Sequence, residues 1–190
     1  MSKKAFRNVI LAVAAIGVCV AVVIIMKGNY FKSGGGGADS ARSAVFSKFM
    51  VESTVYFYFA DRKSEYLTAE ERLFSHPETP VEFAKMIVDG LIKGPQRGGI
   101  RTVPAETALK AFYMTKEGTA VADFTKEMSD KHPGGARTEY LTIMSLTNSL
   151  VMNIPDIKRV KILIDGKEAE TLAGHIDLSE PFYASMELVR

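Results

Sequence analysis

An uninterrupted apolar run near the N-terminus of this chain is long enough to span a membrane. Residues Val9–Met26 are 18 consecutive positions without a charged side chain or a proline. A helix of about 18 or more apolar residues can cross a hydrocarbon core of about 30 Å, because it satisfies its own backbone polar groups. Three cationic residues precede the run and two follow it, which slightly favours a cytoplasmic N-terminus. We therefore expect residues 1–8 in the cytoplasm, a single-pass signal anchor over 9–26, and the rest of the chain outside the cytoplasm.

Two other interpretations of the apolar run fit less well. A cleaved signal peptide has an apolar core of about 7–15 residues and then a small-x-small site, whereas this run is longer and ends in Met26-Lys27-Gly28. Cleavage stays open as the less favoured alternative. Lipoprotein processing would use Cys19, but this cysteine lies inside the run and follows Val18, where a small residue is needed. Because Cys19 is the only cysteine, the exported part forms no disulfides.

A glycine-rich stretch separates the apolar run from the rest of the chain. Residues 27–46 include four consecutive glycines, Gly34–Gly37, which are typical of a flexible linker. We expect residues 47–190 to form one extracytoplasmic domain with a single hydrophobic core. From residue 43 onwards there are 18 Lys and Arg against 21 Asp and Glu, a net charge of −3. This charge does not suit the phosphate backbone of a nucleic acid, so we expect no nucleic-acid partner.

The first half of the expected domain contains one clear strand and one clear helix. Aromatic and β-branched residues at successive positions predict a strand over Ser53–Asp61 that is buried on both faces or central in its sheet. A polar loop then leads to a short strand predicted at Arg72–Ser75. Thr79 and Pro80 are typical of a helix start, with Thr79 as the N-cap, and the helix is expected to end at Gly94.

The second half predicts two hairpins and another helix. The first hairpin surrounds Lys116-Glu117-Gly118, and a largely apolar helix follows at 137–152. In the second hairpin, an Asp165-Gly166 turn connects an alternating strand to a return strand over Lys167–Leu172. The sequence therefore predicts an α+β fold, with a mostly antiparallel sheet and two helices packed on one face. We expect the strand from Lys167 to Leu172 to be an exposed sheet edge that pairs with a partner.

The stretch Leu91–Pro104, with three glycines, two prolines and two arginines, superficially resembles a phosphate-binding loop. Such a loop follows a strand and precedes a helix, whose N–H groups point at the anion. Here the order is reversed, because a helix ends at Gly94, a turn follows, and a strand region is expected over 100–103. A turn is therefore the favoured interpretation. Anion binding by Arg97 and Arg101 is kept as the alternative.

Residues capable of catalysis do not form a recognisable set in the sequence. His76 and His132 precede prolines in predicted loops, and no pair of histidines has the four-residue helical spacing of metal ligands. No cysteine lies outside the apolar run, and no serine lies in a Gly-x-Ser-x-Gly motif. Glu65, Glu70 and Glu71 lack the alternating oxygen ligands of a calcium loop. We therefore expect no enzymatic activity, no metal and no cofactor.

Several short motifs, taken in order, resemble the GerMN domain family, a module of sporulation and spore-germination proteins. The resemblance covers residues 54–182, nearly all of the expected domain. It implies a non-enzymatic extracytoplasmic domain whose fold is similar to ring-building motifs, and it brings no catalytic residues. The motifs are Leu91-x-x-Gly94-Pro95, the Val103-Pro104 step, and the run from Pro155 through Asp165-Gly166 to Gly174-His175-Ile176-Asp177.

The expected function is protein–protein contact in the assembly of a bacterial cell envelope, in sporulation or spore germination as the resemblance implies. The chain would sit in the inner (cytoplasmic) membrane with an envelope protein as its partner, and self-association is left open. The sequence departs from the family pattern in four respects: the single copy of the domain, the membrane helix, Glu106 and Ser149. A role in another envelope process is therefore also compatible with the sequence. The alternative is a binding module for cell-wall glycan or another anionic envelope ligand, using Arg97 and Arg101.

Overall fold

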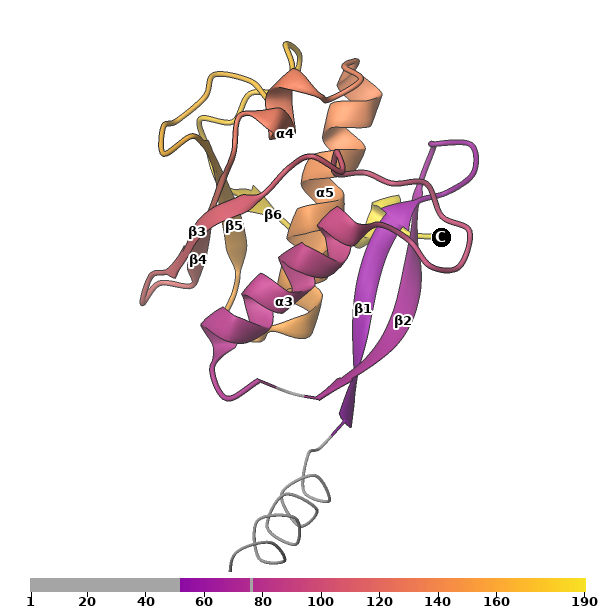
Figure 1. Cartoon of the computed structure of the whole chain (residues 1–190), viewed down its shortest axis with the longest axis vertical. Coiled ribbons are helices and arrows are strands. Elements are labelled where there is room, and N and C mark those ends of the chain that lie inside the picture. The colour runs from indigo at the N-terminus through magenta and orange to yellow at the C-terminus, as the bar shows by residue number, and fades with distance from the viewer. Residues whose placement is uncertain (1–51, 76) are drawn as a thin grey trace, which may run out of the picture. The chain divides into compact units, whose positions relative to one another are not determined.

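A computed structural model describes residues 52–75 and 77–190 (Figure 1). The predicted anchor at 9–26, the linker at 27–46 and the predicted domain start at Ser47 lie outside these described residues. Within the described ranges, none of the helices is long and apolar enough to cross a membrane. The elements are β1 (Glu52–Ala60), β2 (Leu67–Ser75), α3 (Pro80–Lys93), β3 (Leu109–Met114), β4 (Thr119–Phe124), α4 (Glu127–Asp130), α5 (Ala136–Asn153), β5 (Arg159–Ile164), β6 (Phe182–Tyr183) and the 3₁₀ helix η1 (Met186–Leu188).

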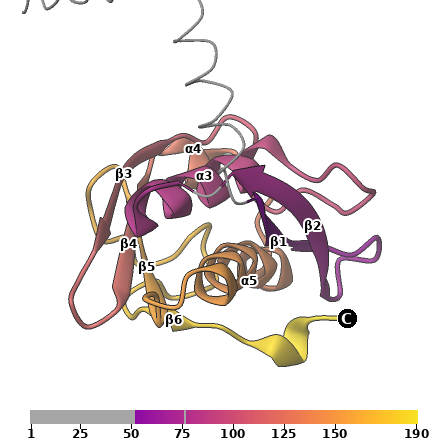
Figure 2. The same cartoon turned by 90° about the horizontal axis from the view of Figure 1, so that it is seen from below.

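The strands form two sheets, with helices α3 and α5 between them (Figure 2). β1 and β2 form an antiparallel hairpin, in which Tyr56 lies opposite Glu71. The second sheet has the order β3-β4-β5-β6, and its strands β4 and β5 run parallel, with Ala122 opposite Ile162. A parallel pair needs a crossover connection, which contains α4 and α5. The α+β class is confirmed. The prediction of a single sheet is wrong, because the β1–β2 hairpin forms a second layer on the other side of the helices.

Helix α3 begins and ends where the sequence predicts, as do the β3–β4 hairpin and α5 to within a few residues. The Thr79 hydroxyl accepts a hydrogen bond from the backbone N–H of Glu82 at 3.2 Å, and Pro80 occupies the first turn. The first backbone N–H groups of a helix have no partner within the helix, and here Thr79 accepts one of them while Pro80 has none to satisfy. The start of α3 is therefore determined by residues next to it in the sequence. The buried face of α3 comprises Phe83, Ala84, Ile87, Val88, Gly90 and Leu91.

The close approach of α3 to β1 depends on Gly90. A Cβ atom at this position would lie 2.3 Å from the ring of Phe57. The Phe57 ring is fully buried, and its centroid lies 6.4 Å from that of the Phe59 ring. The guanidinium carbon of Arg72 lies over the Phe57 ring, 4.4 Å from its centroid. The ring is held by these neighbours, so a side chain at Gly90 would force the packing to rearrange.

Strand β2 is longer than predicted, because it begins at Leu67 and not near Arg72. Its inward-facing positions include Glu70 and Arg72, which are both buried. Buried charges are costly unless they are paired, and here the carboxylate and guanidinium lie 2.6 Å apart. The strand does alternate between buried and exposed residues along this part. Two charged residues occupy buried positions, so the alternation was not visible as a hydrophobic pattern.

The strand predicted over residues 100–103 does not form. Ile100 makes a single bridge to Ala60, with N–H to carbonyl distances of 2.7 and 3.2 Å. The side chain of Arg101 then turns to the C-terminal carbonyls of α3. The hydroxyl of Thr102 bonds to that of Ser145 on α5 at 2.7 Å. Side-chain bonds to the two helices therefore hold this segment in place of a strand ladder.

The second predicted hairpin has its turn but not its return strand. Asp165 and Gly166 have φ angles of 53° and 76°, as a type I′ turn requires. One bridge joins Ile164 to Lys167, and the ladder ends there. The strand predicted over Lys167–Leu172 is therefore wrong. Strand β6 pairs with the same edge of β5, so that edge is already partly occupied.

The C-terminal segment, residues 182–190, connects the two sheets (Figure 2). It starts as β6 beside β5, and Val189 forms a parallel bridge to Leu67 at the start of β2. Between these points, the side-chain amide of Asn148 on α5 bonds to both backbone groups of Ser185, at 2.9 and 3.0 Å. The segment therefore ties both sheets to the central helix.

Candidate functional site

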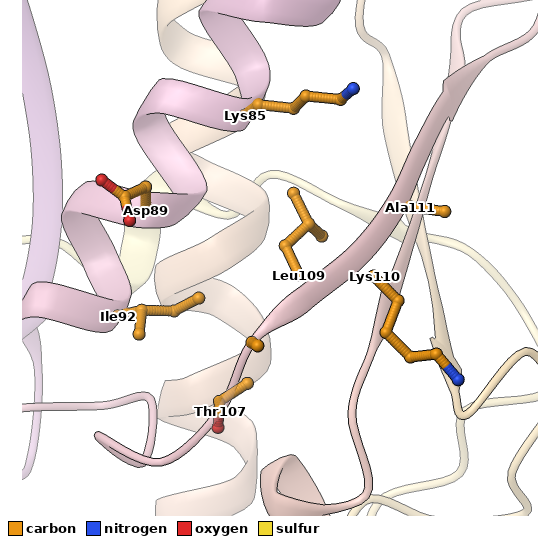
Figure 3. A pocket seen from close by; sticks show the side chains of 8 residues that line it. Lys85, Asp89, Ile92, Thr107, Leu109, Lys110 and Ala111 are labelled. Carbon is orange, nitrogen blue, oxygen red and sulfur yellow. The ribbon is translucent and has the colours of Figure 1, made fainter.

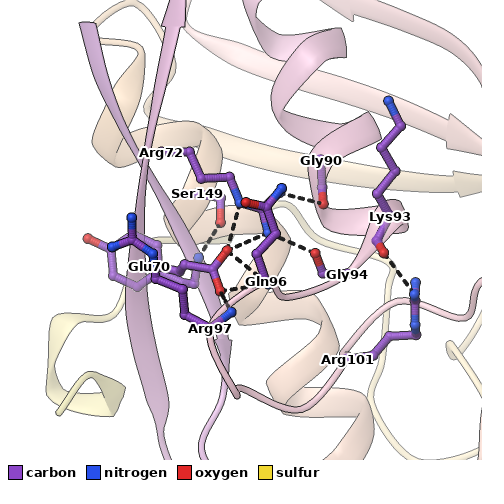
Figure 4. Close-up of polar contacts among 10 residues, drawn as sticks. Glu70, Arg72, Gly90, Lys93, Gly94, Gln96, Arg97, Arg101 and Ser149 are labelled. Atoms are coloured by element: carbon purple, nitrogen blue, oxygen red, sulfur yellow. Dashed lines mark hydrogen bonds and ion pairs between the residues drawn. The ribbon is translucent and has the colours of Figure 1, made fainter.

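The loop after α3, which belongs to the stretch Leu91–Pro104, is held by an ion pair on β2 (Figure 4). The side chains of Glu70 and Arg72 are each 7% exposed. The Glu70 carboxylate accepts the backbone N–H groups of Gln96 at 2.9 Å and of Arg97 at 2.8 Å. The Arg72 guanidinium donates to the carbonyl of Gly94 at 2.7 Å. The ion pair thus supplies both an acceptor and a donor to the backbone of the loop.

Hydrogen bonding keeps Glu70 ionised despite its burial. Burial alone would raise the pKa of this carboxyl group. Hydrogen bonds from the Arg72 side chain and from the backbone N–H groups of Arg97 and Gln96 outweigh burial and hold the pKa below its usual value. Arg72 also contacts the Phe57 ring at a cation–π distance, so the pair links the loop to the core.

This geometry argues against phosphate binding by the loop. The backbone N–H groups of Gln96 and Arg97, which an anion would need, already bind the Glu70 carboxylate. A bound phosphate would bring its negative charge next to that buried carboxylate. The loop also follows the end of α3, where Gly94 has a φ of 89°. The favoured interpretation of the stretch as a helix end and turn is confirmed.

The two arginines kept as anion-binding candidates lie in different environments (Figure 4). The Arg101 guanidinium donates to the carbonyls of Ile92 and Lys93, the latter at 2.8 Å, and so caps the C-terminus of α3. The Arg97 side chain is exposed and makes no hydrogen bond or ion pair within the described residues. It lines a hollow of about 360 Å³ whose walls include Phe59. The structure therefore does not bring the two guanidinium groups together.

Helix α5 presents a row of polar side chains to the free edge of β1. Ser145, Ser149 and Asn153 recur every four residues, so they lie on one face of the helix. The Ser149 hydroxyl accepts the backbone N–H of Tyr58 at 3.0 Å, and the Ser145 hydroxyl donates to the Tyr58 carbonyl. One turn further, the Asn153 amide accepts the N–H of Tyr56 at 2.9 Å and donates to its carbonyl at 2.7 Å.

These contacts replace a neighbouring strand along β1. Two alternatives were predicted for this strand, burial on both faces or a central position in its sheet. The central position does not occur, because β2 is the one strand neighbour of β1 among the described elements. Its burial was correctly predicted, since residues 57–60 are all buried. The polar residues at four-residue spacing inside an apolar helix are the sequence signal that could have revealed this contact.

Comparison with known proteins identifies the family. Residues 54–170 match the model of the Germane family, described as sporulation and spore germination. The chain belongs to the Germane family. The resemblance to GerMN domains is thereby confirmed. Comparison with curated proteins found no match.

Solved structures share the fold of this Germane domain at low sequence identity. The tandem GerMN domains of the sporulation protein GerM from Bacillus subtilis match with a TM-score of 0.57 and 23% identity, over 70% of this chain and 46% of that one. The first GerMN domain of the same protein matches with a TM-score of 0.53 and 20% identity, over 71% and 98%. A protein of Clostridium perfringens, named provisionally as a lipoprotein, matches with a TM-score of 0.51 and 23% identity, over 70% and 87%.

A second buried carboxylate in the Germane domain holds the loop after β5. Glu139, in the first turn of α5, is 0% exposed. One of its oxygens accepts the backbone N–H groups of Ala173, His175 and Ile176 at 3.0 to 3.1 Å, and the other bonds to Nδ1 of His175 at 2.7 Å. Burial would raise the pKa of Glu139, but these hydrogen bonds lower it to about 2. The residue types in this stretch did not predict the contact.

The arrangement of His175 beside a carboxylate resembles part of a catalytic triad. A triad also needs a nucleophile within hydrogen-bond reach of the second ring nitrogen. Among the described residues, no hydroxyl bonds to the His175 ring. No three His, Cys, Asp or Glu residues in the described part of the chain are grouped closely enough to hold a metal ion.

His132, the other histidine of the described residues, is buried between a loop and α5. Its Nδ1 accepts the N–H of Gly134 at 3.0 Å, and its Nε2 lies 2.9 Å from the hydroxyl of Thr142. This pattern assigns the proton of a neutral ring to Nε2. Burial lowers the pKa of His132, and the charge of Glu139 opposes this effect only in part. The ring therefore acts as a structural link between the loop and the helix.

The stretch predicted to pair with a partner does not present a strand edge. Lys167 is exposed beside the turn, whereas Leu172 is 1% exposed and belongs to the core. The loop that follows is fixed from inside the domain. The amino group of Lys161 donates to the carbonyls of Leu178, at 3.1 Å, and of Ser179.

Proposed function

We propose that this chain is a membrane-anchored module that acts outside the cytoplasm, through protein–protein contact during assembly of the cell envelope in sporulation or spore germination. The family description supports the process. The apolar run at 9–26 supports a single-pass anchor in the inner membrane with residues 1–8 in the cytoplasm. The provisional naming of the Clostridium perfringens relative as a lipoprotein supports attachment to a membrane.

The observation that carries the proposal is a set of exposed apolar side chains, which we call the apolar surface. Contiguous exposed apolar residues on a soluble domain mark sites of contact with other proteins. These side chains lie outside the buried core, and in the proposed function a partner covers them. The apolar surface comprises Tyr56, Leu73, Met152 and Met186, which are between 38% and 68% exposed.

The members of the apolar surface come from segments that are bonded around the C-terminal half of α5. Tyr56 and Leu73 are diagonal neighbours on one face of the β1–β2 hairpin. The backbone of Tyr56 bonds to Asn153, the residue after Met152. Met186 directly follows Ser185, whose backbone N–H bonds to Asn148. Asn148 lies one helical turn before Met152 on α5. The surface is therefore built on firmly held backbone, which lowers the entropy cost of binding.

Site-specific photo-crosslinking in cells tests the proposal. The full chain would carry a photoreactive amino acid in place of Leu73 or Met152, and in a matched control in place of Glu168, whose side chain is 72% exposed outside the apolar surface. We expect both positions on the apolar surface, but not the control, to crosslink to the same envelope protein. Equal crosslinking at all three positions, or none at any, would refute the proposal.

A reporter enzyme fused after Arg190 tests the localisation separately. A phosphatase that folds only outside the cytoplasm is expected to be active in this fusion. Activity restricted to a reporter that works only in the cytoplasm would overturn the anchor and its orientation, while leaving the contact surface to be judged by crosslinking.

A second function, binding of cell-wall glycan or another anionic envelope ligand, is favoured by one observation. The guanidinium of Arg97 is free within the described residues and lines a hollow of about 360 Å³, whose walls also include Glu70 and Glu71. Glycan hydroxyl groups can bond to a guanidinium and to carboxylates alike, so a glycan suits this hollow better than a phosphate. Arg101 caps α3, so the candidate site rests on Arg97 alone. Salt-sensitive retention on purified wall material should be lost in Arg97→Ala and kept in Arg137→Ala, an exposed arginine in the first turn of α5. Equal retention of the two variants would rule this function out.

A further inference from the structure

Helix α3 and the edge strand β3 border two hollows that lie in line with each other. The first has a volume of about 420 Å³ and is lined by Lys85, Asp89 and Ile92 of α3 and by residues 107–111 (Figure 3). The second has a volume of about 490 Å³ and lies at the other end of β3. It is lined by Pro80, Val81, Met114, Thr115, Lys116, Gly118, Pro155, Asp156 and Lys158.

One face of α3 lines both hollows. Val81 belongs to the second hollow, and Lys85, Asp89 and Ile92 belong to the first. These four residues recur at three- or four-residue spacing, which places them on one side of the helix. We call the combined feature the α3–β3 groove. It follows the helix for most of its length and borders the strand at both ends.

The dimensions and the backbone of the groove suit an extended chain. β3 is the first strand in the order of its sheet, so among the described strands only β4 pairs with it. The other edge of an edge strand presents N–H and C=O groups that can pair with another chain. At about 3.4 Å per residue, the six residues of β3 span at most about 20 Å, and a register shift between Leu109 and Ala111 leaves Ala111–Met114 as the regular part of the edge.

The side chains of the groove combine apolar contact with positive charge. Lys85 and Ile92 extend from α3 toward β3, and Leu109 points from β3 toward α3 (Figure 3). Ile92 and Leu109 are half-buried, so each retains apolar surface for a ligand. The charged residues that line the groove are four lysines and two aspartates: Lys85, Lys110, Lys116, Lys158, Asp89 and Asp156.

Ion pairs within the domain leave this positive charge unbalanced. Lys110 is paired with Asp165 at 2.7 Å, and Asp89 is paired with Lys93. Lys85 makes no ion pair or hydrogen bond in the part of the chain that the structure describes. The groove is thus cationic on a domain whose net charge is −3 from residue 43 onwards. A ligand with carboxylates is complementary to it.

We propose that the α3–β3 groove binds an extended acidic segment of a partner protein, which adds to the sheet as a strand beside β3. Its backbone pairs with the free edge of β3, its apolar side chains pack on Ile92 and Leu109, and its carboxylates face Lys85. The groove shares no residue with the apolar surface. The inference therefore goes beyond the proposed function, because it names a second contact site and the class of ligand.

Peptides with a blocked edge test whether the ligand binds as a strand. The full chain in detergent micelles would be titrated with the blocked heptapeptide Thr-Val-Thr-Glu-Thr-Glu-Thr, whose even residues place valine and glutamate on the same face of the strand, and binding followed by NMR. Two further versions carry N-methyl groups on the odd or on the even residues. Only one edge of an added strand faces β3, so one version should bind at least about tenfold more weakly and the other nearly as well as the parent peptide. Equal binding of both versions, or equal loss of both, would overturn the proposal.

A charge exchange tests the position of the ligand. Lys85→Glu should weaken binding of the acidic heptapeptide about threefold or more and should favour a version with lysine in place of glutamate. Lys63→Glu makes the same charge change in the exposed β1–β2 loop and should leave both affinities unchanged. Equal effects of the two substitutions would mean that only overall charge matters, and the groove would not be the site.

Two controls test whether the groove is specific for an acidic strand. Inorganic polyphosphate that competes fully with the peptide, combined with equal binding of the two N-methylated versions, would identify a general polyanion site and overturn the proposal. Leu73→Glu, on the apolar surface, should leave peptide binding unchanged. Failure of the peptide experiments would leave crosslinking from Leu73 and Met152 intact, so the two proposals fail independently.

Discussion

The side-chain amide of Asn153 pairs with the backbone of Tyr56 as a residue of a neighbouring strand would, with an N–H to Oδ1 distance of 2.9 Å and an Nδ2 to carbonyl distance of 2.7 Å. Asn148, on the same helix, makes the same pair of bonds with Ser185. Helix α5 therefore fixes β1 and the C-terminal segment by side-chain amides. The apolar surface is built around these two attachments.

Replacing the two asparagines should affect stability unequally. Asn148 is 0% exposed, so Asn148→Ala leaves the half-buried backbone groups of Ser185 without partners and should lower the free energy of unfolding by about 2–3 kcal/mol. The bonds of Asn153 are accessible to water, so Asn153→Ala should cost only about 1 kcal/mol. Urea unfolding of the full chain measures both values. The reverse order would contradict the proposed difference in solvent access.

Breaking the ion pair on β2 should be strongly destabilising. Glu70→Ala leaves the 7% exposed Arg72 side chain without its carboxylate and should cost about 3–5 kcal/mol. Glu70→Gln keeps an acceptor for the loop and should cost about 1–3 kcal/mol. Glu71→Ala, at the neighbouring exposed position, should change the unfolding free energy by less than about 0.5 kcal/mol. A loss in Glu71→Ala as large as in Glu70→Ala would show that the pair is not the cause.

Features that depend on neighbouring residues could be predicted from the sequence. The start of α3 follows from Thr79 and Pro80, and the turn at Asp165-Gly166 follows from residues that tolerate positive φ. In these cases the stabilising contacts lie within a few residues. Periodicity also located the β3–β4 hairpin and the buried helix α5.

Features that depend on polar contacts between distant segments could not be predicted. The Ser149 hydroxyl takes the place of a strand beside Tyr58, 91 residues away. Glu70 reaches Gln96, 26 residues away, to hold a loop that looked like a ligand site. Hydrophobic patterns do not report such bonds, because the participating residues are polar and buried. For the same reason, the sequence did not distinguish Arg101, which caps the end of α3, from Arg97, whose side chain is exposed.

Alanine at Gly90 should be destabilising although it favours a helix. The gain in helix propensity is about 1 kcal/mol. A Cβ atom 2.3 Å from the buried Phe57 ring requires repacking at the upper end of the usual cost, about 2–3 kcal/mol, so a net loss of about 1–2 kcal/mol is expected. In a Gly90→Ala and Phe57→Leu double variant the clash is relieved, so the combined loss should be smaller than the sum of the single losses. Strict additivity would exclude the clash as the cause.

The buried carboxylate of Glu139 should make stability depend on pH in the acidic range. The pKa of Glu139 in the folded protein is about 2, below its ordinary value of 4.5. The unfolded chain therefore takes up the proton first. The contribution is fully present above pH 4.5 and is lost as the pH falls toward 2, and it corresponds to about 3 kcal/mol.

The variant Glu139→Gln isolates this contribution. The difference in unfolding free energy between the wild type and the variant should shrink as the pH falls from 4.5 toward 2. Other carboxyl groups titrate in both proteins, so they cancel in the difference. A difference that stays constant down to pH 2 would contradict the lowered pKa.

His132 should cause a loss of stability at a higher pH than Glu139 does. Burial lowers the pKa of His132 in the folded protein below 6.5, so the unfolded chain binds the proton more readily. The contribution of the neutral ring is fully present above pH 6.5 and decreases as the pH falls toward the folded pKa. Protonation also places a proton on Nδ1, which accepts the N–H of Gly134, and removes that acceptor. NMR titration of the ring should give a pKa below 6.5, and His132→Gln should lack this pH dependence. A measured pKa at or above 6.5 would mean that the ring is not held neutral by burial.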